Sequence, residues 1–123
     1  MSKRGSGSST RAASFSATEL NITGTEKQIA YARDIVQGAF RIMDMNIKWN
    51  LDHAKAEKDK WRKKPYKDYA SDWKEYKAEM TDVFRKNAKK EIKAADIIDT
   101  KYNFQDGVIR SWEQWRRMKG KKG

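Results

Sequence analysis

The stretch TGTEKQIAYARDIVQGAF, residues 23–40, indicates an amphipathic helix that begins at a threonine cap. Two capping boxes are possible, over residues 23–26 and 25–28, because in each a threonine precedes Glu or Gln by three positions. Apolar residues then recur at steps of three and four, which places them on one helical face. They are Ile29, Ala32, Val36, Ala39, Phe40, Met43, Ile47, Leu51 and Ala54. The pattern predicts a helix over residues 25–62.

A second helix is expected to fold back on the first. Pro65 lacks a backbone N–H and disfavours helical geometry at Lys64, so the first helix is predicted to end before it. Helical spacing of apolar residues resumes at Tyr69 and continues to Ile98, which predicts a second helix over residues 66–98. Two helices of similar length joined by a short connection favour an antiparallel hairpin. Acidic residues early in the second helix would then face lysines late in the first.

The two ends of the chain differ in composition from the hairpin. Residues 1–21 are mostly Ser, Gly, Ala and Thr with interspersed basic residues, a composition that cannot offset the entropy cost of ordering. They are predicted to form a disordered basic arm. Residues 22–123 are predicted to form a single helical domain, in which a short amphipathic helix over residues 106–119 follows the hairpin. The expected fold class is all-α.

The composition limits the classes of function. A net charge of +11 over 123 residues favours a polyanionic partner, such as nucleic acid or an acidic protein surface. The absence of cysteine excludes disulfides, thiolate nucleophiles and sulfur-ligated metals. No run approaches the roughly 18 apolar residues that a membrane span needs. We therefore expect a cytoplasmic protein without a membrane partner.

A first basic cluster surrounds the predicted tip of the hairpin. It contains Lys58, Lys60, Arg62, Lys63, Lys64 and Lys67, interleaved with Trp61, Tyr66 and Tyr69. Lysines hold phosphates by charge and aromatic rings stack on exposed bases, so this mixture is typical of a nucleic-acid-binding surface. In the alternative interpretation, the lysines offset the dipole of the first helix and the aromatic residues belong to the core.

A second basic cluster is predicted on the outer face of the second helix. It contains Arg85, Lys86, Lys89, Lys90 and Lys93. Like charges at helical spacing repel one another unless an anion neutralises them, which favours a surface that faces phosphates. Compensation of the helix dipole again provides a structural alternative.

A third cluster near the C-terminus combines aromatic and basic residues. Trp112, Trp115, Arg116 and Arg117 are the candidates for binding a partner. In the alternative, the tryptophans pack on the exposed seam of the hairpin or on a second protomer, because two helices alone leave one side uncovered.

The sequence offers no catalytic constellation. His53 and Glu57 have a spacing that could share a metal ion, but the chain contains a single histidine. Neither an acid–base pair, an activated nucleophile nor a glycine-rich phosphate loop is present. We therefore predict a protein that is not an enzyme and has no cofactor or metal site.

The stretch ITGTEKQIAYA, residues 22–32, resembles the opening of short, mostly uncharacterised helical proteins of bacterial phages and mobile elements. These proteins begin with the motif L-T-G-[ST]-E-K-Q-I-x-[WY]-A, and this chain departs from it at Ile22. AADIID, residues 94–99, is similar to the end of their later helix but lacks its tryptophan. The resemblance implies a phage or mobile-element origin and the cytoplasm of a bacterial host cell, and it implies no particular activity.

Three functional hypotheses follow from these patterns. The first is a non-enzymatic accessory protein that binds DNA or RNA through phosphate contacts of low sequence specificity. The second is a protein-binding regulator, for instance an inhibitor of a host defence nucleoprotein complex of the CRISPR type. The third is a structural helical homodimer whose charge only keeps it in solution.

Overall fold

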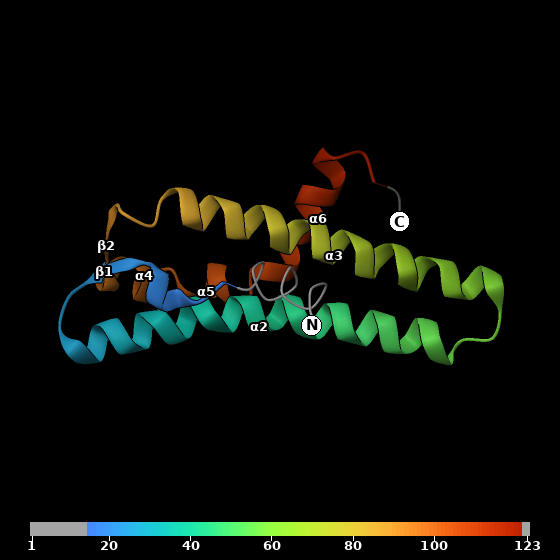
Figure 1. Cartoon of the computed structure of the whole chain (residues 1–123), viewed down its shortest axis with the longest axis horizontal. Helices are drawn as coiled ribbons and strands as arrows, with labels where there is room; N and C mark the ends of the chain where they lie inside the picture. Colours follow the sequence, from blue (N-terminus) through green and yellow to red (C-terminus); the bar gives the residue numbers. More distant parts are fainter. Residues whose placement is uncertain (1–14, 122–123) are drawn as a thin grey trace, which may run out of the picture.

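The computed structural model describes residues 15–121, most of which are helical (Figure 1). The elements are η1 (Ala17–Glu19), β1 (Asn21–Thr23), α2 (Glu26–Ala56), α3 (Lys60–Lys86), β2 (Glu91–Lys93), α4 (Ala94–Asp99), α5 (Lys101–Phe104) and α6 (Val108–Met118). Helices α2 and α3 form a long antiparallel hairpin, which confirms the all-α class and the predicted hairpin. None of the helices in residues 15–121 is long and apolar enough to cross a membrane.

The second of the two possible capping boxes starts α2. The backbone N–H of Gln28 donates to Thr25 Oγ1 at 3.2 Å, and the N–H of Thr25 donates to Gln28 Oε1 at 3.1 Å. Thr23 lies in β1 instead, and Gly24 turns the chain between strand and helix at a φ of 146°. A side chain at Gly24 would be strained at this positive φ, so glycine is needed here.

The tip of the hairpin lies at residues 57–59, and the predicted break at Pro65 is wrong. Asp59 caps α3, since its Oδ1 accepts the backbone N–H of Trp61 at 2.8 Å. Pro65 lies inside α3, which continues for 27 residues in all. A good cap and the packing of the rest of the helix outweigh the local cost of one proline near the N-terminal end.

Pro65→Ala is expected to raise the free energy of unfolding by about 2 kcal/mol. Alanine would restore a backbone hydrogen bond to the Trp61 carbonyl and remove the clash of the proline ring with it. The greater freedom of the unfolded chain offsets part of this gain. Urea unfolding followed by circular dichroism measures the change, with the exposed Lys67→Ala as a control that should stay within about 0.5 kcal/mol. A lower stability would mean that Pro65 shapes the tip.

The predicted second helix is wrong beyond Lys86. Residues 87–90 form a turn, and β2 then pairs in parallel with β1, with Ile22 opposite Ile92. The side-chain amide of Asn87 donates to the Val83 carbonyl at 2.7 Å and helps to terminate α3. Two short helices, α4 and α5, follow the strand pair. The third predicted helix forms as α6 and is shorter by two residues at its start and by one at its end.

Residues 15–21 are packed on the hairpin, so the predicted disordered arm is too long. The Phe15 ring lies 4.9 Å from the Phe40 ring and 5.4 Å from the Phe84 ring, between centroids. Gln37 on α2 ties this segment down, because its Oε1 accepts the N–H of Ala17 at 2.8 Å and its Nε2 donates to the Phe15 carbonyl at 3.2 Å. Residues 1–14 of the predicted arm lie outside the described residues.

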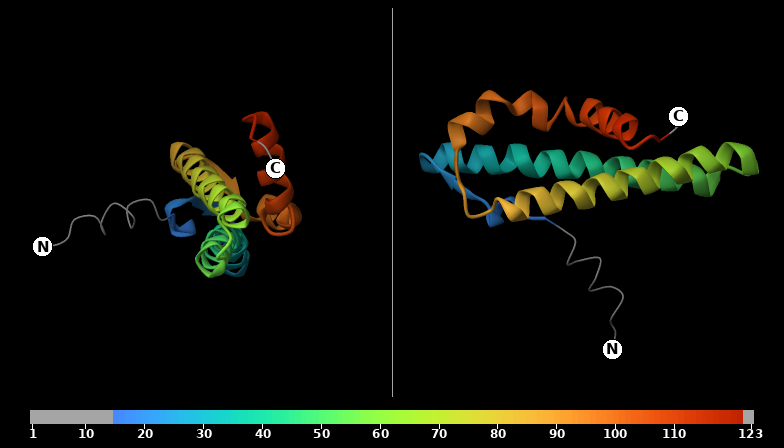
Figure 2. Two further views of the ribbon diagram at one scale, coloured as in Figure 1. Left: turned by 90° about the vertical axis from the view of Figure 1, so that its right-hand side faces the viewer. Right: turned by 90° about the horizontal axis from the view of Figure 1, so that it is seen from above.

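Helix α6 covers the middle of the hairpin. Trp112 stacks on Trp73 of α3, with ring centroids 4.3 Å apart and planes 8° from parallel. Figure 2 shows α4, α5 and α6 following one side of the hairpin, and α6 ends well before the tip. Between α6 and residues 57–59 the described chain consists of α2 and α3 alone, so the tip protrudes as a two-helix rod.

Candidate nucleic-acid interface

The predicted tip cluster is divided between two sides of α3 and the tip turn. Helical spacing places Lys60, Lys63, Lys64 and Lys67 on one side, and they line a shallow pocket together with Trp61 and Asp68. We call Lys60, Trp61, Lys63, Lys64 and Lys67 the tip face. Arg62 lies about 160° away from the centre of this face, at 100° per residue, and Lys58 belongs to the turn before the helix.

Three of the four lysines of the tip face have no acidic partner among the described residues. Lys64 pairs with Asp68 at 2.8 Å, an exposed i,i+4 contact. Such a pair contributes a few tenths of a kcal/mol and is easily exchanged. Among residues 15–121, no carboxylate forms a salt bridge with Lys60, Lys63 or Lys67. These three cations are therefore available to an anion.

The three aromatic residues of the predicted tip cluster have different surroundings. Trp61 is 79% exposed and projects from the first turn of α3. Tyr66 is partly buried and lies near Trp49 and His53 of α2, with ring centroids 5.9 and 5.4 Å away. Tyr69 packs under α6, edge-on to Trp112. Only Trp61 is available as a platform at the tip face.

The second predicted cluster does not form one helical face. Arg85 and Lys86 end α3, whereas Lys89 and Lys90 lie in the turn and Lys93 in β2. These residues lie at the end of the hairpin opposite the tip (Figure 1).

Arg85 in this cluster is engaged with the packed N-terminal segment. Its Nε donates to Glu19 Oε1 at 3.0 Å. This hydrogen bond lowers the pKa of the Glu19 carboxyl below its usual value. The prediction that these five residues share one face of the second helix is therefore wrong. The four lysines of the cluster are nevertheless exposed.

The third predicted cluster is mostly core, as the packing alternative expected. Trp112 and Trp115 are each 9% exposed and Arg116 is 8% exposed, so these three side chains do not form a surface for a partner. Trp115 Nε1 donates to Glu79 Oε1 at 3.2 Å, and this bond, followed by that of Lys119, lowers the pKa of the Glu79 carboxyl. Arg117 remains exposed.

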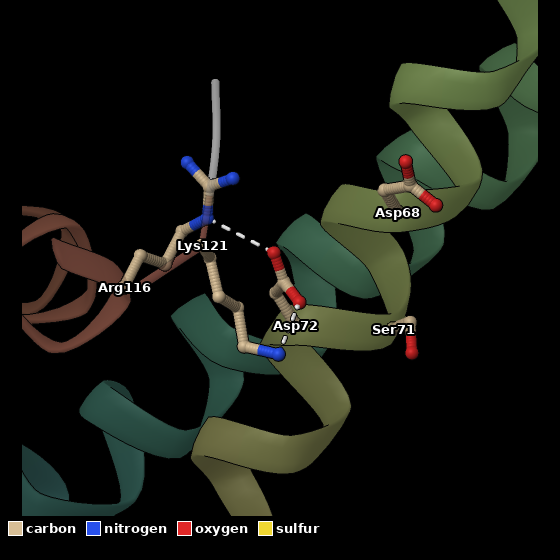
Figure 3. A pocket seen from close by; sticks show the side chains of 5 residues that line it. All are labelled: Asp68, Ser71, Asp72, Arg116 and Lys121. Atoms are coloured by element: carbon tan, nitrogen blue, oxygen red, sulfur yellow. Dashed lines mark hydrogen bonds and ion pairs between the residues drawn. The ribbon is translucent and has the colours of Figure 1, made fainter. Parts of the chain in front are cut away.

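Three acidic residues of α3, Asp72, Glu75 and Glu79, pair with the C-terminal segment, contrary to the expectation that the acidic residues of α3 face lysines of α2. Asp72 Oδ2 accepts from Arg116 Nε at 2.9 Å, and Asp72 Oδ1 lies 3.3 Å from Lys121 Nζ (Figure 3). Glu75 pairs with Lys121, and Glu79 pairs with Lys119. The sequence carries a signal for this, because the acids alternate with Tyr69, Trp73 and Tyr76 along the face that a third helix covers. The pairing also depends on where the third helix packs, which the local spacing of residues does not specify.

The titratable groups of the described residues do not cluster as metal ligands do. No group of three or more His, Asp or Glu side chains within residues 15–121 could hold a metal ion. His53 stacks on Trp49 at 3.8 Å between ring centroids, and its Nδ1 lies 2.8 Å from the Trp49 carbonyl oxygen.

No family model, curated protein or solved structure matches the chain. The resemblance of residues 22–32 to phage and mobile-element proteins therefore stays a prediction.

Proposed function

We propose that this protein is a non-enzymatic nucleic-acid-binding accessory protein whose tip face contacts phosphates. The observation that carries the proposal is the set of cations Lys60, Lys63 and Lys67, which share one helical face without acidic partners among the described residues. Lysines at this spacing can follow successive phosphates along one strand. Contacts of this kind read no base sequence, so binding should be largely independent of sequence.

The surroundings of the tip face favour the same function. Residues 55–67 hold seven lysines and arginines against two acidic residues. The tip also protrudes beyond α6, so a nucleic acid can reach the tip lysines directly, whereas Asp72 farther along α3 is buried and paired with Arg116. The net charge of +11 would speed the encounter over longer distances.

The cellular setting is part of the proposal and rests on the sequence alone. We infer an accessory role in a phage or mobile element, in the cytoplasm of a bacterial host cell, from the resemblance of residues 22–32. In the regulator hypothesis a basic face meets an acidic surface or a guide or target strand, with Trp112, Trp115 or another aromatic residue as anchor, and the two named tryptophans are buried. No contact in the described chain specifically favours that alternative or the homodimer.

Replacing Lys60, Lys63, Lys64 and Lys67 together by glutamine is expected to weaken nucleic-acid binding at least tenfold near 0.1 M salt. Each lost phosphate contact reduces the slope of log affinity against log salt by about 0.7–0.9, so the slope should fall by about 3. Fluorescence anisotropy with labelled oligonucleotides of unrelated sequence, over a salt series, measures both quantities.

A matched control removes the same charge elsewhere. Replacing Lys86, Lys89, Lys90 and Lys93 by glutamine lowers the net charge equally, at the opposite end of the hairpin, and should reduce the slope by less than about 1. Equal effects of the two variants would show that binding follows net charge and not the tip face. Absence of binding by the unaltered protein at low salt would reject the function, and sedimentation analysis would then test the homodimer.

A further inference from the structure

Trp61 is exposed in a way that the fold itself does not explain. Its side chain is 79% exposed, and its ring stacks on no other aromatic ring within residues 15–121. The cap by Asp59 fixes the backbone from which it projects. A large apolar ring held in water is unfavourable, so the residue stabilises the free protein little. Its position among lysines suits a ligand that is both flat and anionic.

The tip face continues along α3 toward the C-terminal segment. The pocket of the tip face shares Asp68 with a second pocket, which is lined by Asp68, Ser71, Asp72, Arg116 and Lys121. Figure 3 shows this second pocket, with Arg116 and Lys121 approaching Asp72 from the C-terminal segment. The two pockets together form a strip on one side of α3, from Trp61 to Lys121.

The acidic residues of the strip are neutralised. Asp68 pairs with Lys64 at 2.8 Å, and Asp72 pairs with Arg116 at 2.9 Å and with Lys121 at 3.3 Å. Asp72 is also buried. A phosphate chain that follows the strip therefore meets paired carboxylates, and the lysines without an acidic partner among the described residues lie at the tip end of the strip.

We infer that the strip binds single-stranded nucleic acid, with an unpaired base stacked on Trp61. This inference rests on the proposed function and names its substrate class. Bases of a single strand present their faces, and an exposed aromatic ring among lysines binds them with little regard to sequence. In a duplex the base faces are already stacked, so Trp61 could reach one only by separating a base step, which costs free energy. A single strand is therefore preferred over a duplex.

The length of the strip sets the size of the bound segment. From Trp61 to Asp72 the helix advances about 16 Å at 1.5 Å per residue. A stacked strand advances about 3.4 Å per nucleotide, so the strip covers about five nucleotides.

The test compares three labelled ligands of equal length, by anisotropy with the full chain at fixed salt. They are a mixed-sequence single strand, the same strand in a duplex, and a strand in which every nucleotide is abasic. The single strand is expected to bind about tenfold more tightly than the duplex. Trp61→Ala should weaken single-strand binding by about 5- to 150-fold, the range that corresponds to one stacked base. It should leave duplex and abasic binding within about twofold, since neither presents a base face to the ring.

Two variants separate stacking from mere exposure. Trp61→Phe keeps an aromatic face and should retain single-strand affinity within about threefold. Tyr102→Ala removes another exposed aromatic side chain, which is 66% exposed on α5 and far from the tip in the sequence. This variant should have no effect on binding.

The inference would be overturned if the single strand and the duplex bound equally and Trp61→Ala had no effect. If the lysine variant still weakened binding in that case, the proposed function would stand. Loss of all binding by the unaltered protein would reject both.

Discussion

Trp73→Ala is expected to lower the free energy of unfolding by about 3–5 kcal/mol. Trp73 is 1% exposed and lies where the hairpin meets α6. Its ring stacks on Trp112 at 4.3 Å and meets Tyr76 edge-on at 6.0 Å, between centroids. Alanine would leave a cavity between two rigid helices that neither can close, so the lost contacts are not recovered. Urea unfolding followed by circular dichroism measures the change.

A second tryptophan provides the comparison for this prediction. Trp49 lies near the C-terminal end of α2 and is 53% exposed. Trp49→Ala should cost about 1 kcal/mol or less, because most of the removed surface is already in water. Similar losses for the two variants would show that the stability does not come from the three-helix region.

The hairpin was predictable because its signal is long and local. Apolar residues at helical spacing continue for several turns of α2, and Ala32, Val36 and Phe40 on that face are fully buried. Pro65 predicts a tip that is too late in the sequence, because proline usually marks the end of a helix. Its cost is local, about 3 kcal/mol, whereas the cap at Asp59 and the packing of the whole helix act together.

The strand pair was not predictable from local patterns. A strand of three residues is too short to show an alternation of period two, and Ala94 and Ile98 after it resume a helical spacing. The partner of β2 is β1, about 70 residues earlier in the chain. Such a pairing depends on tertiary contacts, and the same holds for Phe15, whose binding site is built by Phe40 and Phe84.

The composition of the tip cluster was predictable, but the face that each residue occupies was not. Which side of the hairpin each lysine occupies depends on the helix to which it belongs. The sequence predicts that the second helix starts at residue 66, whereas α3 starts at Lys60. The exposure of Trp61, however, can be read from its neighbours, because the positions three and four residues away are Glu57, Lys58, Lys64 and Pro65. Trp112 lies four residues after Val108 and three before Trp115, the spacing of a buried helical face.

Asp72→Ala is expected to lower the free energy of unfolding by about 3–5 kcal/mol, because it removes the carboxylate that faces a buried Arg116. The two side chains are about 10% exposed and lie 2.9 Å apart, Nε to Oδ2. The Arg116 guanidinium also lies 4.8 Å from the Tyr69 ring and 5.0 Å from the Trp112 ring, to the centroids. These ring contacts favour the cation but do not replace the carboxylate. Urea unfolding measures the loss, and hydrogen exchange of the α6 amides shows whether that helix opens first.

The control for this prediction is Lys121→Ala, which removes the other cation of Asp72. Its side chain is 27% exposed, so the expected loss is about 1 kcal/mol or less. The double variant Asp72→Leu with Arg116→Met should return to within about 1 kcal/mol of the unaltered protein, because apolar residues of similar volume avoid the desolvation of both charges. The single variants Asp72→Leu and Arg116→Met complete a double-mutant cycle, and a coupling energy near zero in it would show that the two side chains act independently. In that case α6 would be held on the hairpin by its tryptophans and not by the ion pair.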